Sequence, residues 1–231
     1  IIAGDGVEAL QLVRSHVPDI IVSDVMMPRM NGYKLCKTIK EDINISHIPV
    51  ILLTARDDRQ SQISGYKNGA DGYLSKPFEV EMLIELIRNR LKNREYTKKR
   101  YLNAGLIPTP EESTISLTDE TFLIKLNSII QENIENSNLG IQFICQEVGL
   151  GRSSLYNKLK ALTGMGANEY ISKLRIEKAI TLISGTDMPF SEIAEKTGFT
   201  TPSYFSTAFK QYTGETPSQY KERKKKGLAD K

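Results

Sequence analysis

One pattern occurs twice in the C-terminal half of this chain, and it constrains the fold more than any other feature. The first copy reads ICQEVGLGRSSLYNKLKALTG, residues 144–164, and the second reads IAEKTGFTTPSYFSTAFKQYTG, residues 193–214. In both copies a glycine is followed by a hydroxyl-rich stretch and then by two apolar residues four positions apart. Because glycine can end one helix and a hydroxyl can begin the next, each copy predicts two helices joined by a tight turn.

The turn residues support this interpretation. Gly149 and Gly198 are expected to take left-handed backbone angles, which suit glycine best. We expect a hydroxyl to cap each second helix, from Ser153 or Ser154 and from Thr200 or Thr201. Pro202 fits the first turn of a helix, because its missing N–H is not needed there.

The second helix of each copy pairs an apolar stripe with a polar face, and such a face is free to meet a major groove. We predict base-edge contacts from Arg152, Ser153, Tyr156, Asn157, Ser203, Ser206 and Thr207. Phosphate contacts are predicted for Lys160 and Lys210. The alternative is a helical hairpin without a ligand, and the second matched copy favours the nucleic-acid interpretation.

Residues of about 119–224 resemble an AraC-type DNA-binding domain. The sequence FSEIAEKTGFTTPSYFSTAFKQYTGETPSQY, residues 190–220, carries most of the match. The resemblance implies two helix-turn-helix units, 141–164 and 190–214, that bind double-stranded DNA in successive major grooves. A helix from 168 to about 184 is expected to join them. We interpret Arg175 in that helix first as a brace between the units and second as a phosphate contact.

Charge is distributed unevenly along the chain. Residues 1–87 hold 9 Lys/Arg and 12 Asp/Glu, whereas residues 141–226 hold 13 Lys/Arg and 8 Asp/Glu. This asymmetry indicates that the C-terminal part meets nucleic acid. No apolar run has the length needed to cross a membrane. The two distant cysteines do not suggest a disulfide scaffold or a zinc site, so a reducing cytoplasm is expected.

Strand and helix patterns alternate over the first part of the chain. The expected strands are 1–3, 20–23, 50–53 and 72–74, and the expected helices are 7–16, 33–40, 59–68 and 79 to about 103. Strands that alternate with helices indicate a doubly wound parallel sheet covered on both faces.

A polar residue stands at the carboxyl end of three of these strands: Asp24, Thr54 and Lys76. Ligands bind at this edge of an open α/β sheet, so the three side chains are expected to converge there. Asp24 could attack a phosphoryl group and become an acyl phosphate. Thr54 could hydrogen-bond a phosphoryl oxygen, and Lys76 could neutralise its charge.

The same stretch resembles the receiver domain of two-component response regulators. The match is carried by DVMMPRMNG, residues 24–32, by IPVILLTA, residues 48–55, and by GADGYLSKPF, residues 69–78. The resemblance implies a flavodoxin-like parallel sheet and a phosphoacceptor at Asp24. It also implies that Thr54 and Tyr73 act as the switch pair beside Lys76. The peptide bond between Lys76 and Pro77 is often cis in such domains.

One departure concerns the metal site. Receivers begin with a strand that ends in two acidic residues, and this pair binds Mg²⁺ beside the phosphoacceptor. Here the sequence starts at what resembles the second strand, and Asp5 lies in another turn. We interpret the chain as a fragment that lacks the first strand. Only Asp24 and the Met26 backbone carbonyl remain as metal ligands, so Mg²⁺ is expected only if that strand is restored.

The resulting organisation has a partial receiver at 1–102 with a long last helix, a linker at 103–118, a DNA-binding domain at 119–226 and a tail at 227–231. This order resembles the C-terminal end of hybrid two-component systems, in which a sensor and a histidine kinase precede the receiver.

We therefore predict a phosphorylation-controlled transcription regulator whose partners are DNA and a phosphodonor histidine kinase domain, in hybrid systems on the same polypeptide. Activation is expected to produce a homodimer. We expect this segment in the cytoplasm without membrane contact, and the parent protein anchored in the inner membrane.

Two other classes of function are alternatives for this sequence. One is a phosphorelay receiver whose helical module docks protein instead of DNA, which salt-dependent DNA binding would distinguish. The other is an enzyme. The sequence shows no catalytic cysteine or serine constellation, metal-ligand cluster or glycine-rich phosphate loop, and His16 and His47 are expected in surface turns. An enzyme is therefore rejected for this chain.

Overall fold

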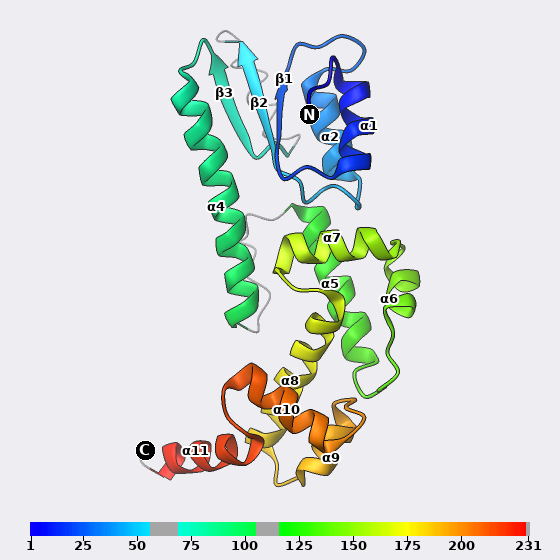
Figure 1. Cartoon of the computed structure of the whole chain (residues 1–231), viewed down its shortest axis with the longest axis vertical. Helices are drawn as coiled ribbons and strands as arrows, with labels where there is room; N and C mark the ends of the chain where they lie inside the picture. Colours follow the sequence, from blue (N-terminus) through cyan, green and yellow to red (C-terminus); the bar gives the residue numbers. More distant parts are fainter. Residues whose placement is uncertain (56–68, 105–115, 230–231) are drawn as a thin grey trace. The chain divides into compact units, whose positions relative to one another are not determined.

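The computed structural model describes residues 1–55, 69–104 and 116–229 (Figure 1). They form two compact units, one of residues 1–123 with 157–164 and one of residues 124–156 with 165–231. The predicted helix at 59–68 lies outside the described residues. The predicted boundaries at 102 and 118 stay predictions.

The first unit contains a parallel sheet with the strand order β1-β2-β3. Its strands are β1 (Ile21–Asp24), β2 (Val50–Ala55) and β3 (Gly72–Lys76). In the register of the sheet Asp24 pairs with Leu53, and Thr54 pairs with Ser75. The predicted α/β fold is therefore confirmed over the described residues, with all three carboxyl ends at one edge.

Helices cover both faces of this sheet (Figure 1). On one face α1 (Gly6–His16) and α2 (Gly32–Glu41) pack around a core that includes Leu35, Ile39 and Leu52, none of which is exposed. On the other face lies α4 (Val80–Ala104), whose Leu86 is 3.5 Å from the point where a Cβ of Gly72 would stand. Burial on both faces explains why β2 reads as a continuous apolar run, whereas Val22 of β1 is 39% exposed.

The strand expected at residues 1–3 is wrong. Ile1–Ala3 have no regular structure, and Ile1 and Ile2 are exposed. An extended apolar segment becomes a strand only when a neighbour completes its hydrogen bonds, and no described residue pairs with this one. Asp5 instead caps α1, because its side chain accepts hydrogen bonds from the Val7 and Glu8 amides at 2.8 and 3.1 Å.

Helices make up the rest of the described chain: α5 (Leu117–Glu132), α6 (Ile141–Val148), α7 (Arg152–Thr163), α8 (Ala167–Gly185), α9 (Phe190–Lys196), α10 (Pro202–Thr213) and α11 (Pro217–Ala229). The two predicted helix pairs are α6 with α7 and α9 with α10, and α8 joins them. The helix α5 ends at Glu132, and the asparagine-rich residues that follow form turns.

The turns of the two helix pairs follow most of the predictions. Gly149 and Gly198 have φ angles of 75° and 70°, as expected. Thr201 caps α10 by accepting a hydrogen bond from the Tyr204 amide at 3.1 Å. The cap expected from Ser153 or Ser154 is wrong, because both residues lie inside α7. Gly151 holds the position before that helix, and its carbonyl accepts from the Leu155 amide at 2.9 Å.

An aromatic row forms the core of the second helix pair. The rings of Phe199, Phe205, Phe209 and Tyr220 follow one another at centroid distances between 5.4 and 5.7 Å. Tilted and edge-to-face rings at this separation add about 0.5–1.5 kcal/mol per pair beyond the burial of their area. Ile176 and Ala179 of α8 belong to the same core, so α8 is held to this pair along its middle.

Several polar side chains of the first unit are buried. Lys158 is completely buried and pairs with Asp119, and the Lys158 ammonium also donates to the Ser46 hydroxyl at 2.8 Å. His47 is only 8% exposed, so its expected position in a surface turn is wrong.

Both Cys36 and Cys145 are buried thiols. No described helix is both long and apolar enough to span a membrane.

Candidate phosphoryl site and nucleic-acid interface

Asp24 and Lys76 lie in direct contact at the carboxyl edge of the sheet. The Lys76 ammonium donates to Asp24 Oδ2, and the Met26 amide donates to Oδ1 at 3.2 Å. Each side chain is about 40% exposed, with values of 37% for Asp24 and 44% for Lys76. The carboxylate is therefore ion-paired and still accessible from solvent. An attacking group at this edge must be accessible.

The environment of Asp24 keeps the carboxylate ionised. Partial burial alone would raise its pKa, but the hydrogen bond from Lys76, the hydrogen bond from the Met26 amide and the charge of Lys76 together outweigh burial and lower it. A low pKa leaves the nucleophilic form present at neutral pH.

The other predicted residues of this site lie on β2 and β3. Thr54 is completely buried, and its hydroxyl finds no hydrogen-bond partner among the described residues. Tyr73 is half-buried and packs against the core that contains Leu35, Ile39 and Leu52. The Lys76–Pro77 peptide bond is cis. The roles of these residues in a phosphoryl switch stay predictions.

The described residues do not by themselves fit a Mg²⁺ ion at this edge. Mg²⁺ prefers carboxylate and carbonyl oxygens, and it needs several of them or their bridging waters. No group of three or more His, Cys, Asp or Glu gathers at one place in the described part of the chain. Asp5 does not supply a further metal ligand at this edge, because its carboxylate caps α1 and pairs with Arg29.

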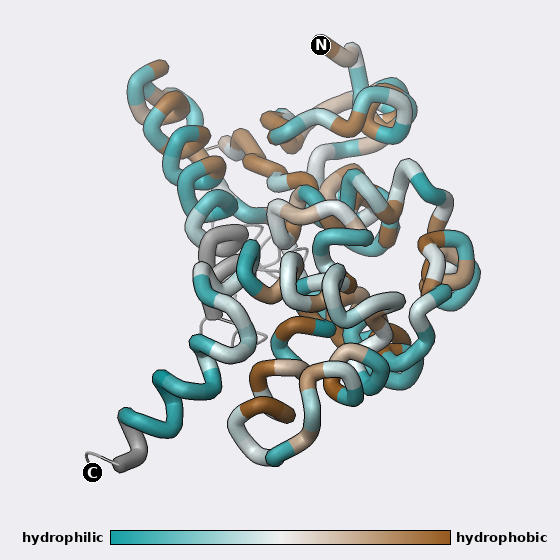
Figure 2. Tube along the Cα trace, turned by 60° about the horizontal axis from the view of Figure 1, so that its bottom comes forward, coloured by the Kyte–Doolittle hydropathy of each residue, from teal (hydrophilic) through white to brown (hydrophobic). Residues whose placement is uncertain are grey.

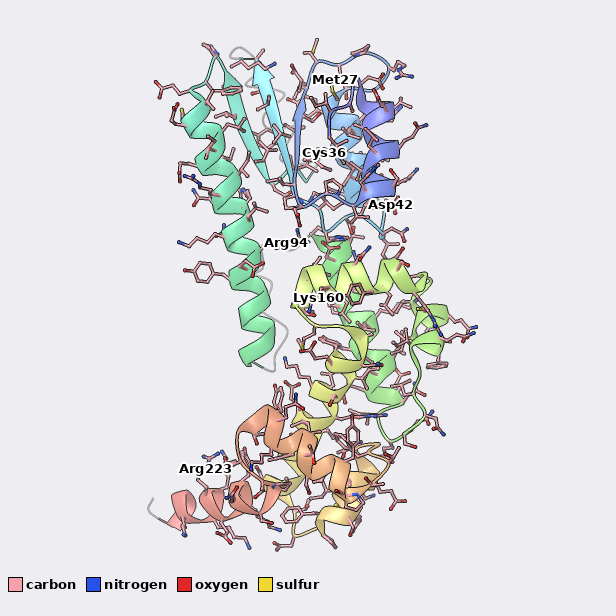
Figure 3. The ribbon with its side chains drawn as sticks, viewed as in Figure 1. Met27, Cys36, Asp42, Arg94, Lys160 and Arg223 are labelled. Atoms are coloured by element: carbon pink, nitrogen blue, oxygen red, sulfur yellow. The ribbon has the colours of Figure 1, made fainter. Side chains whose placement is uncertain are left out.

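The polar face predicted for α7 is open to solvent. Arg152, Ser153, Tyr156, Asn157 and Lys160 are all exposed, whereas Leu155 and Leu159 are buried (Figure 3 labels Lys160). Lys158 is the exception among the polar residues of the helix, since it is buried and belongs to its inner side. A helix with this division can present its outer side to a groove.

The polar face predicted for α10 is similar. Ser203, Thr207 and Lys210 are exposed, and Ser206 is half-buried. The Thr207 hydroxyl donates to the Ser203 carbonyl at 3.1 Å, so its proton is already used within the helix. The face is therefore better suited to apolar and shape-dependent contacts than to bidentate hydrogen bonds.

Sequence reasoning missed Tyr204, which is 56% exposed on α10. It stands three positions before Thr207, and side chains with this spacing share a helix face. That spacing could have identified it. Its ring packs against Phe199 at a centroid distance of 5.7 Å, which orients the phenol without burying it.

The last helix adds positive charge near this surface of the second unit. α11 is coloured hydrophilic over most of its length in Figure 2, and its Lys and Arg side chains include Arg223, labelled in Figure 3. Arg223 pairs with Glu215 at 2.7 Å, and Lys221 pairs with Asp187 at 3.3 Å. These ion pairs within the second unit thus neutralise part of the positive charge of α11.

Two known families match this chain. The response regulator receiver domain matches residues 2–88, and a helix-turn-helix domain matches residues 144–223. The first match contains Asp24, Thr54 and Lys76, and the second contains both polar helix faces.

Three proteins illustrate what the chain is similar to. A protein named histidine kinase P4 from Formosa agariphila is 42% identical over 96% of this chain, which spans only 16% of that protein's length. The probable transcriptional regulator ycf29 of Pyropia yezoensis is 31% identical over 73% of this chain and 81% of its own length. The solved C-terminal domain of AraT, a response regulator from Geobacillus stearothermophilus, is 31% identical over 44% of this chain and 84% of its own, with a TM-score of 0.42.

Proposed function

Since the chain belongs to the two-component response regulators, as a receiver domain followed by an AraC-type helix-turn-helix domain, we propose that phosphorylation of Asp24 controls its binding to double-stranded DNA. This domain content is that of a DNA-binding transcription regulator and not of an enzyme. The observation that carries the proposal is the exposed Asp24 carboxylate, paired with Lys76 at the edge of the sheet.

In the proposed reaction an Asp24 oxygen attacks the phosphorus of a phosphohistidine. The P–N bond breaks, the histidine leaves, and an acyl phosphate forms on Asp24. Lys76 then neutralises a phosphoryl oxygen. The buried Thr54 hydroxyl has no hydrogen-bond partner among the described residues, so it is available to hydrogen-bond another phosphoryl oxygen. Tyr73 would then follow the movement of Thr54. Mg²⁺ would need further acidic ligands beside Asp24 and the Met26 carbonyl.

In the proposed complex with DNA, α7 and α10 enter major grooves. Base edges meet Arg152, Ser153, Tyr156, Asn157, Ser203, Ser206 and Thr207, and phosphates meet Lys160 and Lys210. Exposure of these faces supports the assignment, and Tyr204 joins them on geometric grounds.

The relative named as a histidine kinase supports a hybrid arrangement, because this chain aligns with a small part of a protein several times longer. We propose that the phosphodonor is a histidine kinase domain on the same polypeptide and that the parent protein is anchored in the inner membrane. The DNA-binding segment then works in the cytoplasm, and pairing of two activated chains places two basic modules on neighbouring sites.

The test is duplex binding measured by fluorescence anisotropy between 50 and 200 mM salt, a range over which phosphate contacts lose most of their affinity. The logarithm of the affinity should fall linearly with the logarithm of salt concentration, and an R152A/K160A/K210A variant should bind more weakly. If the intact chain binds no duplex at the lowest salt, the phosphorelay alternative with a protein-docking helical module replaces this proposal.

A further inference from the structure

A small cavity, called the amino-edge cavity below, lies at the amino ends of β2 and β3, at the edge of the sheet opposite Asp24. It is lined by His47 in the loop before β2, by Asp71 just before β3, and by Arg90 and Arg94 of α4. All of these residues belong to the first unit. The cavity has a volume of about 80 Å³ and is partly open to solvent. About 10–15 Å³ is enough for one water, so several waters or one ion with four oxygens would fit.

His47 brings an unsatisfied ring nitrogen to this place. Its side chain is 8% exposed, and its Nδ1 has no hydrogen-bond partner among the described residues. A buried polar atom without a partner is destabilising, and buried polar atoms in folded proteins are usually hydrogen-bonded. A neutral imidazole can carry its proton on Nδ1 and donate it to an oxygen. The ring therefore has room for one more partner, which a bound oxygen would supply.

Arg90 and Arg94 bring positive charge and further donors. They are four positions apart on α4 and so share a face of the helix. Arg90 Nε has no hydrogen-bond partner among the described residues. Arg94 uses Nε and Nη1 for the carbonyls of Ala161 and Asp19, at 3.4 and 3.2 Å, and a guanidinium has five N–H donors. The Asp19 carboxylate lies 3.8 Å from Arg94 on a side chain that is 92% exposed, so water screens this ion pair.

Two carboxylates also line the amino-edge cavity, but each is already paired with a lysine. Lys40 Nζ lies 2.7 Å from Asp71 Oδ2, and the buried Lys158 pairs with Asp119. The charges within these two pairs cancel. The two arginines of α4 therefore leave the lining of the cavity with an excess of positive charge.

The electrostatic environment of His47 agrees with this excess. Burial lowers the pKa of the ring to about 3, helped by the positive charges of Lys158, Arg94 and Lys40, whereas the Asp119 carboxylate opposes them. A place where positive charge disfavours a protonated imidazole is one where an anion is stabilised.

We propose that the amino-edge cavity binds one tetrahedral oxyanion, such as inorganic phosphate or sulfate, through Arg90, Arg94 and the Nδ1–H of His47. The planar forks of the guanidinium groups match the oxygens of such an ion. The anion connects α4 to the loop before β2, so its binding stabilises the first unit. The site lies at the other edge of the sheet from Asp24, and the inference depends neither on phosphorylation nor on DNA binding.

The experiment follows the ring signals of both histidines by NMR in the intact chain at pH 7. Sodium phosphate replaces sodium chloride at constant ionic strength. The His47 signals should shift and reach saturation, and sulfate should compete with phosphate for the same shift. The exposed His16, the other histidine of the chain, should show no saturable shift. A His47 signal that stays in place, or that moves without saturation, would show that water alone fills the cavity and would overturn the inference. So would the absence of competition from sulfate.

A pair of variants on α4 tests the assigned ligands. R90Q should weaken phosphate binding by about tenfold or more, because it removes a charge-assisted contact. R88Q is the matched control, since Arg88 is 71% exposed and pairs with Glu85 on the same helix at 2.6 Å. It should keep the affinity of the wild type. Equal phosphate affinities in R90Q and the wild type would reject the site.

A further variant covers the case in which R90Q does not fold. R90K keeps the positive charge and most of the alkyl chain but lacks the Nε–H and the planar fork. It should bind phosphate about threefold or more weakly than the wild type. If R90K binds phosphate as tightly as the wild type, Arg90 is not a ligand and the inference fails.

Discussion

The Lys76 ammonium at the end of β3 hydrogen-bonds the Asp24 carboxylate at the end of β1, across the width of the described sheet. The two residues are 52 positions apart in sequence, and only the parallel order of the strands brings them together. Partial burial alone would raise the pKa of Asp24, and the pairing with Lys76 helps to lower it.

We expect K76M to raise the pKa of Asp24 above that of the wild type. The pair stabilises the fold at pH values above the ordinary aspartate pKa of 3.8, and this contribution disappears as the pH falls through the lowered value. The carboxyl ¹³C shift of Asp24, followed from pH 2 to 6, measures the change. K37M, which removes a lysine paired with Glu41, should leave the pKa of Asp24 unchanged. A K76M curve that overlays the wild type would show that Lys76 does not set the ionisation of Asp24.

His47 makes folding sensitive to acid. Burial, followed by the charges of Lys158, Arg94 and Lys40, lowers its pKa to about 3 despite the nearby Asp119 carboxylate. The His47 imidazole is protonated near pH 6.5 in the unfolded chain but stays neutral in the folded chain. The free energy of unfolding should therefore fall below pH 6.5, by up to about 1.4 kcal/mol per pH unit. Urea unfolding at pH 7 and pH 5 should show the loss in the wild type and a smaller loss in H47Q. A His47 ring signal that titrates near pH 6.5 in the folded protein contradicts this account.

Gly198 should tolerate alanine less well than Gly149. Both have positive φ, which costs a non-glycine residue about 1–2 kcal/mol. A Cβ at Gly149 meets nothing within 4 Å, whereas one at Gly198 overlaps the Ile134 carbonyl oxygen. We expect G149A to destabilise by about 1 kcal/mol and G198A by about 3 kcal/mol or more, measured by urea unfolding followed by circular dichroism. Similar losses in the two variants would mean that the Gly198 contact is not tight.

Lys160 and Lys210 are predicted to meet phosphates and not bases. Replacing either by alanine should weaken binding to all duplexes alike and reduce the slope of log affinity against log salt by about 0.9. Lys37 on α2 is 60% exposed and serves as the control, since K37A should not change the slope. Unequal losses across unrelated duplexes would instead indicate that the lysine reads bases.

The strand β2 can be located from its continuous apolar run, which is buried on both faces of the sheet. The segment Ile1–Ala3 carries the same apolar signal, yet it is not a strand in the described structure. Composition shows that a segment could pair, but pairing depends on a neighbour that is distant in sequence. The site residues Asp24 and Lys76 could be brought together from sequence only because parallel strands share one carboxyl edge.

The errors in the helical part have a similar origin. A hydroxyl near a helix start predicts a cap, but α7 begins at Arg152, so Ser153 and Ser154 lie inside the helix and Gly151 precedes it. His47 was assigned to the surface because its neighbours in sequence resemble a turn. The charges that act on the buried ring include those of Asp119 and Lys158, more than 70 and 110 positions away, and no local pattern contains that information.

Each compact unit contains one buried thiol, Cys36 on α2 in the first and Cys145 on α6 in the second. Burial raises the pKa of Cys36 to about 12, so the native thiol scarcely reacts and only an opened unit can be alkylated. The chain therefore carries two natural reporters, one for each unit. Peptide mapping after timed exposure to iodoacetamide would give the opening rate of each half of the molecule in one experiment, without an added label.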